Sequence, residues 1–454
     1  MFSFLPLGGA GEIGASCFYL NISGTGIILD CGMHPQKKGM DALPSFELIK
    51  NKPVDYVLIS HAHQDHLAAL PFLIQKHPYL RIVATPQTRA LAEKTLHDSI
   101  SIWREQVKEE SFKIYSHEEV DLLIQSIEYK AYGEVFFLKG YSHSSSDEIK
   151  VTFFDAGHIL GSSGILLELN DLKVFYTGDI NLSPQEILTG AELPDIPVNT
   201  VITETTYGST DSFSLKSWEE EKERFAAEAN KILNDGGSLL LPVFSLGKTQ
   251  EMLVLIYSLI KKRKLIETDI YTGGLGRKIS RIYDYNRFVV NYKDTDFELT
   301  SIPQKNIYDI TDHNDFFKTP SIVLAPGGMM LDKTISYRLG KKWLGIKDSA
   351  IFTVGYMEET TPGYKIANSK KGDKIILSDY ETPLEIKCTI QNFRFGAHSK
   401  REELIEIVKR LKAENVILVH GDPGSVDWVG ANIIKQNKQI KVYASQRGKE
   451  LIIR

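Results

Sequence analysis

Four side chains that can bind metal ions fall within six residues, because residues 61–66 read His-Ala-His-Gln-Asp-His. Neutral imidazole and carboxylate are ligands that suit zinc, with manganese as a harder substitute. The spacing lets His61 and His63 face one ion, while Asp65 and His66 turn toward a second. A chance cluster of surface histidines is the alternative, but it would not bring an aspartate at ligand spacing.

The elements around this cluster predict how it is held. Residues 54–60 are apolar and β-branched enough for a buried strand, and residues 67–73 begin a helical pattern. The cluster therefore lies at the carboxyl end of a strand, where α/β folds place their sites.

Two ions with a position left open for water need more ligands than this cluster supplies. Three later apolar runs predict strands that end close to such a side chain, namely His158, Asp179 and His420. Each of them alone is more often a turn or cap residue. Together with the first cluster they provide what a dinuclear site requires.

This ordered set of motifs resembles the metallo-β-lactamase fold hydrolases. Further segments resemble motifs of the β-CASP branch, whose members process nucleic acids: residues 204–208, 242–251, 395–399 and 419–421. One position departs from that pattern, since Gly396 stands where the family usually has serine. The likeness runs from Gly8 almost to the C-terminus.

The resemblance implies an α/β protein, a metallo-β-lactamase αββα sandwich with an inserted α/β β-CASP domain. We expect the first domain over residues 1–204 and 386–454 and the insertion over residues 205–385, because the metal site is incomplete without His420. Strands and helices alternate within the insertion, which is typical of a small parallel α/β domain.

The ligands divide into two sets around a shared carboxylate. We place them as follows: His61, His63 and His158 on one ion; Asp65, His66 and His420 on the other; Asp179 bridging. Two Zn²⁺ ions, or Mn²⁺ in their place, would supply a nucleophile at neutral pH and neutralise charge on a scissile phosphate. Asp65 is therefore counted with the catalytic group.

A phosphodiester also needs a proton for its departing oxygen, and we expect His398 to supply it. The resemblance implies that Glu204 is its hydrogen-bond partner, which would fix its tautomer and raise its pKa. Two plainer readings stay open. Glu204 could be a helix cap or a surface carboxylate, and His398 a partly buried structural histidine.

Several features bear on the substrate. In the resembled family, RNA-processing members keep a histidine where this chain has His420, whereas the DNA-repair branch commonly has an aliphatic residue. We expect Arg277, Lys278, Arg394 and Ser399 to contact the substrate. The net charge of -5 is unusual for a nucleic-acid enzyme, but local charge steers binding more than the total does.

The leading hypothesis is a two-metal endoribonuclease acting on single-stranded RNA, with 5′-exonuclease activity left open. A DNA nuclease of the same architecture is the alternative. A small-molecule metallohydrolase would have no use for a large insertion. A scaffold with a vestigial site is disfavoured, because buried carboxylates without their ions cost several kcal/mol.

The amino-acid composition limits the class of protein to which the chain can belong. At 42% hydrophobic and 24% charged residues, the 454-residue chain reads as globular, and no apolar run is long enough to span a membrane. Without a signal-peptide pattern, and with only Cys17, Cys31 and Cys388 as cysteines, we expect a cytoplasmic protein with reduced thiols. No membrane partner is expected, and a homodimer stays open.

Two glycine-containing motifs suggest nucleotide binding but lack its context. Residues 9–14 fit the dinucleotide fingerprint, yet a strand-like run follows where a helix is required. Residues 247–249 match the end of a P-loop, but Pro242 occupies the position of its first glycine. We therefore expect no nucleotide site.

Overall fold

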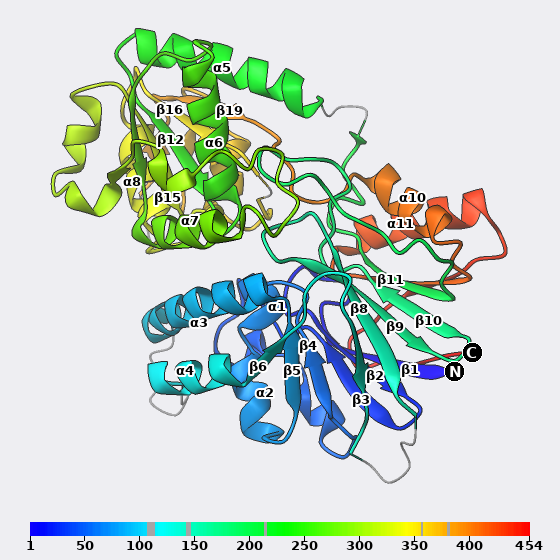
Figure 1. The fold of residues 1–454 in the computed structure, drawn as a ribbon. Helices are drawn as coiled ribbons and strands as arrows, with labels where there is room; N and C mark the ends of the chain where they lie inside the picture. Colours follow the sequence, from blue (N-terminus) through cyan, green and yellow to red (C-terminus); the bar gives the residue numbers. More distant parts are fainter. Residues whose placement is uncertain (107–113, 142–146, 213–215, 356, 379–381) are drawn as a thin grey trace. The chain divides into compact units, whose positions relative to one another are not determined.

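The computed structural model describes residues 1–106, 114–141, 147–212, 216–355, 357–378 and 382–454 (Figure 1). The chain forms two compact units. The first comprises Met1–Pro184, Gly190–Ser212 and Ala397–Arg454, and the second comprises Gln185–Thr189 and Phe213–Gly396.

The first unit is built on two mixed sheets. Among the described residues each has seven strands, in the orders β22-β1-β2-β3-β4-β5-β6 and β21-β20-β11-β10-β9-β8-β7. The first sheet contains β22 (Leu451–Ile453), β1 (Phe2–Gly8), β2 (Cys17–Ile22), β3 (Thr25–Leu29), β4 (Tyr56–Leu58), β5 (Arg81–Ala84) and β6 (Ile127–Tyr129). The second contains β21 (Lys441–Ala444), β20 (Asn415–Val419), β11 (Thr200–Glu204), β10 (Leu172–Tyr176), β9 (Ser163–Leu169), β8 (Ile149–Asp155) and β7 (Val135–Leu138).

The main core of this unit lies between its two sheets. Alternate side chains of each strand point inward, and they include Phe4 and Phe18 from the first sheet and Phe153 and Ile417 from the second. All four are fully buried. Burying aromatic and branched side chains of this size supplies most of the driving force for such a sandwich.

Helices cover the outer faces of the two sheets (Figure 1). Beside the first sheet lie α1 (Gln64–Leu67), α2 (Leu70–Lys76), α3 (Pro86–Gln106) and α4 (His117–Ser126). Against the second lie α10 (Arg401–Arg410) and α11 (Pro423–Gln436), where Leu404 and Val429 pack on Phe175 and Val416. The predicted αββα sandwich is therefore confirmed.

The second unit is a parallel α/β domain, as predicted. Its described sheet has six strands, all paired in parallel: β14 (Lys305–Asn306), β13 (Asp269–Thr272), β15 (Ser321–Pro326), β12 (Leu239–Val243), β16 (Ala350–Thr353) and β19 (Thr389–Asn392). Its helices include α5 (Trp218–Asn234), α6 (Lys248–Lys261), α7 (Gly274–Asn286), α8 (Ile335–Leu344) and α9 (Pro362–Ala367). In addition, β17 (Lys374–Ile375) and β18 (Leu384–Glu385) pair in antiparallel orientation. Within the core, Trp343 is fully buried and donates to the Ser238 carbonyl oxygen.

The sequence-based boundaries were 204/205 and 385/386, whereas the compact units change over at 212/213 and 396/397. The later return has a physical cause, because β19 pairs with β16 and keeps residues 389–392 in the sheet of the second unit. Glu251 also ties a short outlying segment to this unit, since its Oε2 accepts from the backbone nitrogens of Glu186 (2.7 Å) and Ile187 (2.9 Å). Among the described residues, no helix combines the length and apolar character needed to cross a bilayer.

Candidate metal centre

The metal-competent side chains of the sequence motifs meet at one edge of the first unit. Each follows the carboxyl end of a strand or begins the next helix: His61 and His63 after β4, Asp65 and His66 in α1, His158 after β8, Asp179 after β10 and His420 after β20. Strand ends that lie far apart in the chain meet here because the sheets place them at the same edge.

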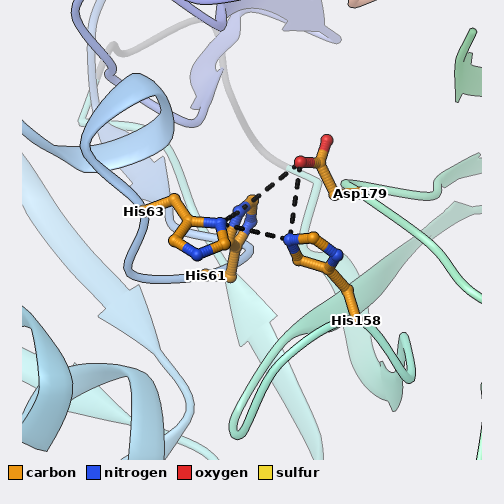
Figure 2. A group of neighbouring side chains, drawn as sticks. All are labelled: His61, His63, His158 and Asp179. Carbon is orange, nitrogen blue, oxygen red and sulfur yellow. Dashed lines mark hydrogen bonds and ion pairs between the residues drawn. The ribbon is translucent and has the colours of Figure 1, made fainter. Parts of the chain in front are cut away.

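The first group consists of His61, His63, His158 and Asp179, whose side chains point toward a common centre (Figure 2). His63 Nδ1 lies 3.2 Å from His61 Nε2 and 3.1 Å from His158 Nε2. Asp179 Oδ2 lies 3.7 Å from the Nε2 atoms of both His61 and His158. A tetrahedral zinc ion with bonds of about 2.0 Å separates its ligand atoms by about 3.3 Å, so this spacing suits one.

The second group consists of Asp65, His66 and His420. His420 Nε2 lies 3.2 Å from Asp65 Oδ2, and His66 Nε2 lies 3.8 Å from the same oxygen. The backbone of His420 has a positive φ of 47°, which is uncommon for a residue with a side chain. That conformation turns the chain immediately after β20.

Asp179 offers one carboxylate oxygen to each group. Its Oδ2 faces the first group, and its Oδ1 lies 3.3 Å from His66 Nε2 and 3.2 Å from His420 Nδ1. Its side chain is 3% exposed and Oδ1 accepts no hydrogen bond in the described structure. A buried carboxylate oxygen surrounded by imidazole nitrogens is the arrangement that a bound cation would satisfy.

Asp30 contacts the ligand His66 at Nδ1, the ring nitrogen that faces away from the ligand group. It is fully buried, and its Oδ2 lies 2.8 Å from His66 Nδ1. The same oxygen accepts from Ser60 Oγ (2.7 Å) and Tyr176 Oη (2.6 Å), while Oδ1 accepts from the Ser60 backbone nitrogen (2.6 Å). A carboxylate on Nδ1 directs the other nitrogen of His66, Nε2, toward the ligand group.

Other imidazoles are oriented in the same way. His158 Nδ1 lies 2.7 Å from the Ala397 carbonyl oxygen, and His61 Nδ1 lies 3.0 Å from Ser60 Oγ. Each contact leaves Nε2 with a lone pair facing the first group. Burial lowers the pKa of both His61 and His158 well below its ordinary value, and neighbouring imidazoles lower it further. Both rings are thus held neutral, the form that binds metal.

The carboxylates in and around the second group favour a positive charge at His66. Burial opposes protonation of His66, but the carboxylates of Asp179, Asp65 and Asp30 outweigh burial and raise its pKa well above the ordinary value. Burial opposes ionisation of Asp179 in turn, but the neighbouring histidines hold its pKa well below the usual range. The donor set therefore favours a cation among these carboxylates, and it fits a divalent ion in each group.

His398 stands beside the first group and contacts Glu204. Its Nδ1 lies 3.0 Å from Glu204 Oε1 and 3.1 Å from Oε2. Burial lowers the pKa of His398, but the Glu204 carboxylate outweighs burial, so that its pKa is raised. The Glu204 carboxylate is 1% exposed and is itself held, because Oε1 accepts from the Ile180 backbone nitrogen (2.7 Å). Neither a helix cap nor a surface carboxylate describes this residue.

The residues predicted to contact substrate have separate locations. Ser399 belongs to the first unit and is 1% exposed, with its Oγ accepting from the Leu182 backbone nitrogen at 3.0 Å. Arg394 is exposed in the second unit, and its backbone nitrogen donates to Glu221 Oε1. Arg277 and Lys278 are exposed near the start of α7. Substrate contact by these four residues stays a prediction.

Sequence reasoning missed Asp30, and it gave no role to Ser60 or Tyr207. The ring of Tyr207 packs edge-on against His398, with centroids 5.4 Å apart. A local signal for Asp30 did exist, because it ends an apolar strand just as the recognised ligands do. Its positive φ of 58° is a second mark that only the backbone reveals.

Three family patterns match successive parts of the chain. They are described as the metallo-beta-lactamase superfamily (residues 10–229), the Beta-Casp domain (residues 249–366) and the Zn-dependent metallo-hydrolase RNA specificity domain (residues 383–445). The chain belongs to the β-CASP branch of the metallo-β-lactamase superfamily. The resemblance stated from the motifs is therefore confirmed, and the zinc in the family description agrees with the donor set of this β-CASP protein.

Relatives of this β-CASP protein align along almost its whole length. Endoribonuclease YSH1 of Candida glabrata is 30% identical over 99% of this chain and 58% of its own. Cleavage and polyadenylation specificity factor subunit 3 of Dictyostelium discoideum is 29% identical over 96% of this chain and 55% of its own. The Integrator complex subunit 11 homolog of the same organism is 29% identical over 99% and 61%. The chain thus spans little more than half the length of these relatives.

A solved structure shares the fold. The crystal structure of a protein of unknown function from Enterococcus faecalis V583 aligns over 100% of both chains, with a TM-score of 0.55 and 11% sequence identity. At that identity the likeness concerns the architecture alone.

Proposed function

We propose that this β-CASP protein is a metal-dependent ribonuclease that cleaves single-stranded RNA, as an endonuclease with 5′-exonuclease activity as a second mode. The observation that carries the proposal is the pairing of two adjoining ligand groups with a non-ligand imidazole at their edge. Hydrolysis of a phosphodiester needs an activated water, neutralised phosphate charge and a proton source, and one edge of the first unit carries groups suited to all three.

The chain's own residues have separate tasks in this proposal. Two divalent cations, when bound, supply Lewis-acid activation of water and offset the charge of the phosphate. The ligand groups hold them, and Asp30 fixes the orientation of His66 behind them. Burial excludes bulk water around the ligands, since His61 and His66 are fully buried. Electrostatic interactions are stronger in such a site than in water.

His398 is the residue we assign to the departing oxygen. Its Nδ1 faces Glu204, which leaves Nε2 as the nitrogen that can deliver a proton. The carboxylate favours the protonated ring, and a raised pKa keeps a larger fraction of His398 ready as an acid near neutral pH. Glu204 thus acts through His398 and not on the substrate.

RNA is the favoured substrate for three reasons. The C-terminal pattern is described as an RNA specificity domain, and one of the aligned relatives is named an endoribonuclease. His420 also completes the second ligand group, and in the resembled family this position carries histidine in RNA-processing members. A DNA nuclease is the alternative, and the rates of cleavage of matched RNA and DNA oligonucleotides distinguish the two.

The test uses the full chain loaded with Zn²⁺ or Mn²⁺ and two 5′-labelled oligonucleotides of one sequence, one RNA and one DNA. We expect internal RNA fragments from the earliest time points, with mononucleotide release as the sign of 5′-exonuclease action. The matched control is Asp179→Ala at the same metal concentration. Faster cleavage of DNA than of RNA, or equal cleavage by the control, would overturn the proposal.

A further inference from the structure

A basic depression lies on the first unit. It has a volume of about 670 Å³, and four cationic side chains line it: Lys37, Lys38, Lys76 and Arg447. Its wall is formed by two short 3-10 helices, η1 (Gly39–Ala42) and η2 (Phe46–Ile49), with the end of α2 and the connection from β21 to β22. Segments distant in the chain therefore bring positive charge to one place.

The charge of this depression is opposite to that of the chain. Asp41 and Glu47 also line it, so its four cations exceed its acids by two, whereas the whole chain carries -5. Lys37 pairs with Glu12 at 2.6 Å. Within the part of the chain that the structure describes, Lys38, Lys76 and Arg447 form no ion pair, and all three are exposed.

Arg447 is held in place by neutral groups. Its Nε donates to Ser45 Oγ at 2.8 Å and its Nη2 donates to the Leu43 carbonyl oxygen at 3.1 Å. Its positive charge thus stays unneutralised while its position is fixed, which suits recognition of a phosphate. Lys76 ends α2 and by itself would be an ordinary helix-end cation. That reading does not explain why Lys38 and Arg447 converge on the same depression.

A short stretch of backbone links the depression to the ligands. The Met33 backbone nitrogen donates to the Gln64 carbonyl oxygen at 3.1 Å, directly beside the ligand His63. The backbone nitrogen of His34, the next residue, donates to the Ala42 carbonyl oxygen at 2.8 Å, between Asp41 and Leu43 of the depression. Two successive backbone hydrogen bonds therefore connect the segment that carries the ligands to the wall of the depression.

We propose that this depression binds the phosphates of the RNA strand next to the cleaved bond. The inference rests on the proposed function and deepens it, because it assigns to the first unit a surface that contacts the RNA backbone outside the metal centre. Cations without ion-pair partners lower the free energy of a bound polyanion, chiefly by releasing its counterions. Such a surface confers no sequence specificity, because it contacts only the phosphate backbone of the RNA.

The test compares two variants that remove three charges each. Lys38→Gln with Lys76→Gln and Arg447→Gln removes the unpaired cations of the depression. Lys435→Gln with Lys438→Gln and Lys441→Gln removes three exposed cations around the end of α11 and the start of β21, at the other end of β20 from His420. Binding of a labelled single-stranded RNA 20-mer is measured by fluorescence anisotropy between 50 and 300 mM salt, with metal content and thermal stability checked for each variant.

For single strands, each lost phosphate contact reduces the slope of log K against log salt by about 0.7. We expect the depression variant to lose about 2 from this slope and to bind the 20-mer at least about tenfold more weakly at 100 mM salt. Its loss in kcat/KM should be at least about tenfold larger for the 20-mer than for a dinucleotide. If the triple variant is unstable, Lys38→Gln with Lys76→Gln tests the same point with an expected slope change of about 1.4.

An unchanged slope in the depression variant, or the same change in the control variant, would overturn the inference. The proposed function fails in a different way, through absence of RNA cleavage by the metal-loaded wild-type chain. The slope of log K against log salt is measured without cleavage, so it tests RNA binding by the depression whether or not the chain cleaves RNA.

Discussion

His398 Nδ1 lies 3.0 Å from Glu204 Oε1, a contact between residues 194 positions apart that both belong to the first unit. One carboxylate oxygen also accepts from the Ile180 backbone nitrogen, so the acceptor cannot follow the imidazole if it moves. The pair therefore fixes the tautomer and the direction of the histidine. The pair adjoins the metal ligands through Asp179, whose carboxylate lies close to both Glu204 and His398.

Replacing His398 should separate proton delivery from metal binding. We expect His398→Ala to keep its metal content and to lose about a hundredfold in kcat, which is the usual scale for removing a general acid. Added imidazole should restore part of that rate. Glu204→Gln, which keeps the shape but not the charge, should lose less, because it lowers the pKa of His398 and weakens its orientation but leaves the imidazole in place. Normal cleavage by His398→Ala would assign the proton to another group.

The two oxygens of Asp179 predict a difference between two ligand variants. Asp179→Ala should lose both metal ions, because one oxygen faces each group. His420→Ala should weaken only the second group and leave about one ion per chain. Metal content after dialysis, measured by mass spectrometry, distinguishes the two. Two ions retained in Asp179→Ala would show that this carboxylate bridges nothing.

Asp30 is expected to govern metal affinity without touching a metal. Asp30→Asn places an amide where His66, Ser60 and Tyr176 all need an acceptor. We expect about 2–4 kcal/mol less stability and about 10- to 100-fold weaker metal binding. Tyr176→Phe is the matched control, since it removes one donor and leaves the contact with His66. Metal titration should show little change in that control, and equal losses in both variants would contradict the assignment.

Asp155 should make stability depend on pH. Burial raises its pKa to about 7, and the nearby Glu192 adds to the effect, although Oδ1 accepts from the Gly157 backbone nitrogen. The unfolded chain has the ordinary pKa of 3.8, so between these values the folded state binds more protons and stability falls as pH rises.

Asp155→Asn removes this cost, so its advantage should grow from about pH 4 to pH 7 and then stay constant, at about 4 kcal/mol. Thermal unfolding at pH 4.5 and at pH 8 measures it. Asp195→Asn, at an exposed position, is the control and should shift neither midpoint. A constant difference for Asp155→Asn at both values would mean that Asp155 is ionised throughout.

Much of this protein could be predicted locally. A strand followed by a ligand is a pattern of near neighbours, so β4 with His61 and β20 with His420 were predicted from short stretches of sequence. The two-fold periodicity of strands and the spacing of helices likewise depend on residues close in the chain. This is why the parallel second unit could be predicted from the residues, whereas the αββα sandwich was implied by the resemblance of the motifs.

Other features depend on contacts that no short stretch encodes. Asp30 reaches His66 because β3 pairs in parallel with β4, with Leu29 opposite Leu58. Residues 389–392 join the sheet of the second unit because β19 pairs with the edge of β16, and no change of composition marks that edge.

By itself, the sequence determined which side chains could bind metal and which family the motifs resemble, because ligand chemistry and strand patterns are properties of near neighbours. Only the tertiary structure decided that Asp179 divides its oxygens between two groups and that Asp30 holds His66 from behind. The physical reason is that strand pairing sets which distant residues meet, and hydrogen bonds form only after that pairing exists.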